Sequence, residues 1–151
     1  MQTRSHMSAA SSSPASKATP STSWMLDTTV ISRALRGDKA VRAYLMKLPR
    51  AGQHICSVIV AELEYGSLRS PNPEHHRARW RRFVTGLIIL PFDADAAVTH
   101  ARLRQTLRQK PIGERDLMIA SIAVTHHLGL LTGNLDEFKR VKGLRSRDCV
   151  R

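Results

Sequence analysis

The chain has 151 residues, a length that suits one domain, and 42% of them are hydrophobic, which is enough for a single core. Only 5% are aromatic, so that core must be aliphatic. The sequence has no apolar run of roughly 18 residues and no secretory leader pattern, so we expect neither a membrane-spanning helix nor export. Cys56 and Cys149 lie far apart and form no CxxC pair, which indicates free thiols in a reduced, cytoplasmic setting.

The chain is strongly basic. It carries 24 Lys and Arg against 12 Asp and Glu, for a formal net charge of +12. Such a charge does not specify a fold, but it favours a polyanionic partner: nucleic acid, an anionic membrane surface or an acidic protein. The alternative is a solvated basic surface that has no partner.

The N-terminal residues differ in composition from the rest. Residues 8–23 are Ser, Ala, Thr and Pro apart from Lys17, so they cannot bury enough apolar surface to fold. The preceding Arg4-Ser5-His6-Met7 resembles a cloning junction, which makes residues 1–6 cloning-derived. We therefore expect a disordered extension over residues 1–23 and one folded domain over 24–151, with a transit peptide as a minor alternative for the extension.

From Trp24 onward, the apolar periodicity alternates between strand and helix. The predicted strands are 24–28, 54–58, 87–92 and 130–132, and the predicted helices are 30–36, 39–48, 58–68, 74–86, 94–108 and 116–128. Such alternation predicts an α/β fold with a central parallel sheet and helices on both faces, in three α/β/α layers.

Four polar side chains stand where such a sheet would carry a site. Asp27 follows the first strand and Asn134 follows the last, and parallel sheets place their sites at the carboxyl ends of strands. Glu62 and Asp116 lie on apolar helices, each within a turn or two of a loop. The topology thus allows three carboxylates and one amide to converge, although no local spacing requires it.

Convergence would create an electrostatic conflict, because neighbouring carboxylates raise one another's pKa. A divalent cation resolves that conflict, and oxygen-only ligands suit Mg²⁺ or Mn²⁺ better than zinc. Such an ion can activate water against a phosphodiester. A basic surface around an acidic metal centre is what a nuclease needs.

Five segments of the chain, in order, resemble the PIN-domain ribonucleases, specifically the VapC-type toxins of bacterial toxin–antitoxin pairs. The resemblance runs from Met25 to about Arg147, and its segments are Met25–Thr29, Ser57–Gly66, Ile89–Asp93, Pro111–Ala120 and Thr132–Phe138. It implies a PIN-like fold and a metal-dependent RNA endonuclease. It also implies a small VapB-like antitoxin and a second copy of the chain as partners, the latter in a homodimer.

By that resemblance Asp27, Glu62 and Asp116 bind the metal. Asn134 stands where the family has a fourth polar ligand, often Asp, which implies fewer charges to hold a second ion. We expect Asn134 to orient a water or a metal-bound ligand.

The chain also departs from the family pattern. Thr29 replaces a usual Asn, residues 107–113 lack a usual Gly, and Cys149 stands where a Trp is common. These departures motivate an alternative, a catalytically weakened PIN-fold module that binds RNA or antitoxin. A DNA or flap nuclease of similar fold is a third possibility, which the compact length argues against.

Each acid also has a structural interpretation. Asp27 is a candidate N-cap for the following helix, a role that is compatible with metal binding. Asp116 is a candidate helix N-terminal acid that interacts with the helix dipole. We expect Asp93 to be an N-cap without a catalytic role, and Asp136 and Glu137 to be surface acids.

The densest basic segment is the predicted helix 74–86. Its arginines at 77, 79, 81 and 82 are predicted to bind RNA phosphates, and the alternative is a solvated helix face. Trp80 is expected either to stack a base or, more readily, to lie in the core on the opposite face.

Overall fold

The computed structural model describes residues 23–150. The predicted disordered extension, with the residues predicted to be cloning-derived, lies outside this range. The exception is Ser23, whose backbone carbonyl accepts a hydrogen bond from the Gly129 amide at 3.2 Å.

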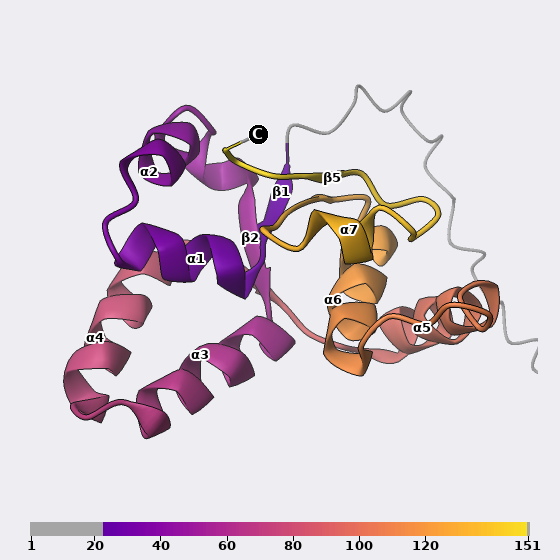
Figure 1. Cartoon of the computed structure of the whole chain (residues 1–151), viewed down its shortest axis with the longest axis horizontal. Coiled ribbons are helices and arrows are strands. Elements are labelled where there is room, and N and C mark those ends of the chain that lie inside the picture. Colours follow the sequence, from indigo (N-terminus) through magenta and orange to yellow (C-terminus); the bar gives the residue numbers. More distant parts are fainter. Residues whose placement is uncertain (1–22, 151) are drawn as a thin grey trace, which may run out of the picture.

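Residues 23–150 form a five-stranded sheet in which every neighbouring pair is parallel, with the order β3-β2-β1-β4-β5 (Figure 1). The strands are β1 Trp24–Leu26, β2 Gln53–Cys56, β3 Ile88–Leu90, β4 Gly129–Leu131 and β5 Ser146–Arg147. The predicted α/β fold with a central parallel sheet is confirmed. Because β1 is central, its carboxyl end lies between the ends of β2 and β4.

Helices flank the sheet on both sides. Figure 1 shows α1 to α4 on one side, and α5 and α6 on the other. The helices are α1 Thr28–Leu35, α2 Lys39–Met46, α3 Ser57–Arg69, α4 Pro73–Val84, α5 Ala94–Thr106, α6 Glu114–Thr125 and α7 Leu135–Phe138, with a 3-10 turn at Arg50–Gly52. No helix within the described range is long and apolar enough to span a membrane.

Element boundaries differ from the prediction where strands pass directly into helices. The first strand ends at Leu26 because the Asp27 carboxylate accepts a hydrogen bond from the Thr28 amide and starts α1 there. The second strand ends at Cys56, and α3 begins at Ser57. Helix α6 begins at Glu114, so Asp116 lies in its first turn instead of opening it. The short elements α7 and β5 were not predicted.

The core lies around the central strands. Met25, Leu26, Leu130 and Leu131 are completely buried. Trp80 is also buried, and its indole N–H donates a hydrogen bond to Ser67 Oγ at 2.9 Å. The core position of Trp80 is thereby confirmed, and the stacking alternative is wrong.

Gly129, at the start of β4, leaves room for the ring of Trp24, its partner on β1. A Cβ atom there would lie 2.5 Å from the Trp24 ring, a distance that side chains cannot accommodate. Arg145 and Arg147 cover the same ring, with their guanidinium carbons 4.3 and 5.4 Å from its centroid. Trp24 is therefore enclosed between β4 and the C-terminal strand.

Candidate functional site

Asp27 is fixed in place by both neighbouring segments at the carboxyl end of β1. It is 4% exposed, and Oδ1 accepts a hydrogen bond from the Thr28 amide at 2.8 Å. Its Oδ2 accepts from the Thr132 hydroxyl at 2.7 Å. Asp27 thus caps α1, as the structural interpretation predicted, while it also faces the loop that follows β4.

Thr29, one of the departures from the family pattern, supports this arrangement. Its hydroxyl donates to Asp27 Oδ2 at 3.2 Å and accepts from the Gly133 amide at 2.8 Å. The Thr132 hydroxyl likewise accepts a hydrogen bond from the backbone amide of Asn134 at 2.9 Å. Two threonine hydroxyls therefore link the ends of β1 and β4, and the replacement at position 29 retains a polar contact with the carboxylate.

Glu62 reaches the same end of the sheet from α3. Its Oε2 accepts a hydrogen bond from the Thr28 hydroxyl, and its Oε1 lies 3.1 Å from Arg115 Nη1. The Arg115 side chain is 73% exposed, so this ion pair is weakly held. The sequence analysis did not identify Arg115, which places a positive charge next to one of the predicted ligands.

Asp116 and Asn134 are in direct contact. The Asn134 side-chain amide donates to Asp116 Oδ2 at 3.2 Å. Glu137, on α7, acts electrostatically on the same carboxyl, so it contributes to the charge of the site as well as to the surface. Asp136, with a side chain that is 93% exposed, is the surface acid that the sequence predicted.

The electrostatics show that the acids act on one another. Burial, then the charges of Asp27 and Glu62, raise the pKa of Asp116 to about 6. Burial also raises the pKa of Asp27, and Glu62 adds to this effect, against the opposing hydrogen bonds from Thr132 and Thr28. Residues separated by as many as 89 positions thus share one acidic locus, as the topology predicted.

The donor chemistry of this locus fits Mg²⁺ or Mn²⁺, because carboxylate and amide oxygens are what these ions prefer. Between residues 23 and 150, however, no three His, Cys, Asp or Glu side chains already surround one point as a metal site would. Glu62 is held by Thr28 and Arg115 instead.

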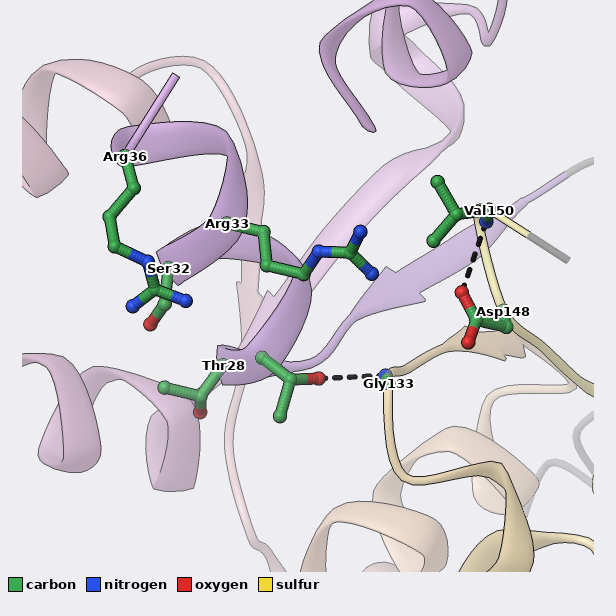
Figure 2. Close-up of a pocket in the computed structure, with 8 residues that line it drawn as sticks. Thr28, Ser32, Arg33, Arg36, Gly133, Asp148 and Val150 are labelled. Atoms are coloured by element: carbon green, nitrogen blue, oxygen red, sulfur yellow. Dashed lines mark hydrogen bonds between the residues drawn. The ribbon is translucent and has the colours of Figure 1, made fainter. Parts of the chain in front are cut away.

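A pocket of about 660 Å³ opens next to Thr28 and Thr29, which contact Glu62 and Asp27 (Figure 2). Thr28, Thr29, Ser32, Arg33 and Arg36 of the α1 segment line one wall, and Gly133, Asp148 and Val150 line the rest. The sequence reasoning did not identify it. Its signal was present in the spacing of polar side chains along residues 28–36.

The arginines of α4 are placed very differently. Arg77 is bound by two acids, with its guanidinium 2.6 Å from Glu64 and 2.5 Å from Glu74. Arg79 donates to the Leu35 carbonyl, and Arg81 lies over the Trp80 ring at 5.6 Å. RNA binding by Arg77, Arg79, Arg81 and Arg82 stays a prediction, and for Arg77 it would require the release of two carboxylates.

The predicted structural roles of Asp93 and Cys56 are confirmed. Asp93 caps α5 by accepting from the Ala96 amide at 3.0 Å. Cys56 is a buried core residue, and both cysteines are free thiols.

Comparison with known proteins gives a consistent result. The PIN domain family model matches residues 24–144. The chain is 34% identical to Ribonuclease VapC2 of Rickettsia felis over 127 residues, which cover 80% of this chain and 93% of that one. It is 35% identical to the tRNA(fMet)-specific endonuclease VapC of Shigella flexneri, over 83% of this chain and 96% of that one.

Solved structures agree with these relatives. A DNA-bound VapBC structure from Salmonella typhimurium superposes with a TM-score of 0.78 at 32% identity, covering 84% of this chain and 98% of that one. VapBC2 from Rickettsia felis, bound to a DNA fragment from its promoter, gives a TM-score of 0.77 at 32% identity and covers 83% and 97% of the two chains.

Proposed function

This chain belongs to the PIN-domain family, as a VapC-type ribonuclease, and we propose that it cuts RNA at the edge of the sheet where Asp27, Glu62 and Asp116 lie. The observation that carries this proposal is the convergence of those three carboxyls at one edge of the sheet: Asp27 follows β1, Glu62 lies on α3 and Asp116 lies in the first turn of α6. The charges of Asp27 and Glu62 both raise the pKa of Asp116, and such a cluster of acids suits a cation site better than a structural one.

In this proposal Asp27, Glu62 and Asp116 hold Mg²⁺ or Mn²⁺. The ion supplies two effects, a lower pKa for water and compensation of the charge that develops on a phosphodiester. Thr29 and Thr132 keep Asp27 in one orientation through its Oδ2 atom. Asn134 orients Asp116 through the 3.2 Å hydrogen bond between their side chains. This role does not require a negative charge on residue 134.

The partners follow from the relatives. VapBC complexes among the similar structures support a small VapB-like antitoxin as the inhibitor of this chain, which would act as the toxin. Exposed apolar residues support a homodimer: Ile88 and Ile89 on the edge strand β3 are 53% and 50% exposed, and Tyr65 of α3 is 58% exposed. A cytoplasmic location, where tRNA is available, completes the proposal.

The test is a cleavage assay on RNA, beginning with tRNA because the Shigella relative is named for it. We expect cleavage with Mg²⁺ or Mn²⁺ and none in excess EDTA. We further expect Asp27→Asn to lower kcat/KM at least about 100-fold, since it removes a proposed ligand. The matched control is Asp95→Asn, which changes an exposed acid in the first turn of α5. Equal cleavage in EDTA, or by Asp27→Asn, would contradict the proposal.

One observation favours a second candidate function, a PIN fold that binds RNA or antitoxin without turnover. Glu62, one of the three proposed metal ligands, is engaged by Arg115 and Thr28. Against it, Thr29 still supports Asp27. Tight Mn²⁺ binding with no cleavage of any RNA pool would identify the chain as this binding module.

A further inference from the structure

The pocket beside the acids is built on two rows of side chains along α1. Thr28, Ser32 and Arg36 follow one another at intervals of four residues, and Thr29 and Arg33 form a parallel row. Residues four apart share one helix face, so each row is continuous. From Thr28 to Arg36 the first row extends about 12 Å, at about 1.5 Å per residue. Figure 2 shows Arg36 with its guanidinium beside Ser32, and Arg33 extending toward Asp148 and Val150.

The two arginines differ in charge balance. Arg33 is neutralised by Asp38, with Nη2 and Oδ2 2.7 Å apart. The Arg36 side chain is exposed and, among the described residues, makes neither an ion pair nor a hydrogen bond. Arg36 therefore supplies an available positive charge to the pocket, and Thr28 and Ser32 of the same row offer hydroxyl groups.

The near end of the pocket is shared with the acidic locus. Thr28 lines the pocket and donates to Glu62, and Thr29 lines it and donates to Asp27. Gly133, across from them, follows Thr132, which also holds Asp27. Because Thr28 and Thr29 belong to both the pocket and the acidic locus, the pocket is suited to the part of a substrate next to the cut.

We infer that this pocket is a subsite for an RNA nucleotide adjacent to the cut, with Arg36 as the contact to its phosphate and Ser32 and Thr28 as polar contacts along the same strand. The inference rests on the proposed function, because it places the substrate of that same site. The volume of the pocket is within the range of small-ligand sites, about 300–1,000 Å³. A guanidinium without an acidic partner favours phosphate, which it can bind through two parallel N–H groups.

The experiment measures binding of a short, 5′-labelled single-stranded RNA in EDTA at several salt concentrations, and cleavage of the same RNA with Mg²⁺. Arg36→Ala should raise Kd about 3- to 10-fold and reduce the slope of log Kd against log salt by about 0.7, the loss of one phosphate contact. KM should rise with it, while kcat stays within about twofold, because a flanking contact binds ground state and transition state alike.

Two further variants make the result specific. Arg36→Lys should recover the salt slope and most of the affinity, because it restores the charge without the bidentate geometry. Arg104→Ala removes an exposed arginine from the last turn of α5, on the other side of the sheet (Figure 1), and should change neither quantity.

The outcomes separate the two proposals. If the unsubstituted protein cuts RNA and Arg36→Ala matches Arg104→Ala in Kd, KM and salt slope, the subsite is wrong and the proposed function stands. The subsite is equally wrong if Arg36→Ala weakens binding of a poly-glutamate peptide and leaves RNA binding unchanged. If the unsubstituted protein neither binds nor cuts RNA, both proposals fail.

Discussion

The acidic edge of the sheet and the arginine-rich helix α4 both carry dense charge, but they balance it in opposite ways. Asp27 and Asp116 form no ion pair within the described part of the chain, and both have raised pKa values. Arg77 on α4 lies between Glu64 and Glu74, and this pairing lowers the pKa of Glu64. Carboxylates that lack an ion-pair partner among the described residues, such as Asp27 and Asp116, are available to a cationic ligand. Charges that are paired within the protein, such as that of Arg77, mainly hold helices together.

After the loss expected for Asp27→Asn, the largest effect should come from the Thr132 hydroxyl, which holds Asp27. Thr132→Val removes the 2.7 Å hydrogen bond to Oδ2 and preserves shape. We expect RNA cleavage and Mn²⁺ affinity to fall about 10- to 100-fold, as for other residues that orient a ligand. Thermal unfolding should also show a lower Tm, because Thr132 is completely buried. Thr106→Val, which removes a hydroxyl bonded to a carbonyl of its own helix, is the control and should retain activity.

The next effect is on stability, and it depends on pH. Burial and the neighbouring acids raise the pKa of Asp116 from 3.8 to about 6, so the folded state binds this proton more tightly than the unfolded state. Stability therefore falls as pH rises between those values, and the penalty is complete near neutral pH. Asp116→Asn should raise the free energy of unfolding near pH 7 by about 1 kcal/mol, after allowance for solvent screening, and leave it nearly unchanged near pH 4.

Urea denaturation in EDTA at both pH values measures this difference. If Asp116→Asn raised the free energy of unfolding equally at pH 7 and at pH 4, the cause would be packing around the new side chain and not the charge of Asp116.

A smaller effect should follow from removal of the cation at the acidic edge. Arg115→Ala frees Glu62 from its 3.1 Å ion pair and leaves three acids without a nearby compensating charge. Because an exposed pair of this kind contributes up to about 1 kcal/mol, we expect Mn²⁺ to bind up to about fivefold more tightly by calorimetry. Weaker binding would instead assign Arg115 to the orientation of Glu62.

The smallest effect on RNA should come from the balanced helix. Arg77→Ala should change RNA affinity less than about twofold, since its charge is already matched, while lowering Tm through the lost contacts to Glu64 and Glu74. Arg82→Ala on the same helix changes an exposed arginine and should affect RNA binding more. RNA affinity is measured by an anisotropy titration. If Arg77→Ala weakened RNA binding more than Arg82→Ala, the density of positive charge on α4 would govern binding, whether or not that charge is paired with an acid.

The sequence predicted the fold class well, and it placed Asp27 and Asn134 correctly at the ends of strands, because both depend on local apolar patterns. Asp27 and Asn134 end apolar runs, and the ends of neighbouring parallel strands must meet. The pairing of Glu62 with Arg115 and of Arg77 with Glu64 was not predictable, because it depends on which helices pack together. The four residues of α7 and the two of β5 are too short to show a period.

The strand order also has a consequence for synthesis. Since β1 lies between β2 and β4, the first two acids emerge early, but Asp116 and Asn134 come from the last third of the chain. Ribosomes add about 5–20 residues per second, so the 72 residues from Glu62 to Asn134 take about 4–14 s. During that interval the nascent chain has half of its acidic locus and an unpaired edge on β1. The acidic locus is therefore completed only after Asn134 has been made, and a partner has the whole of that interval in which to be present.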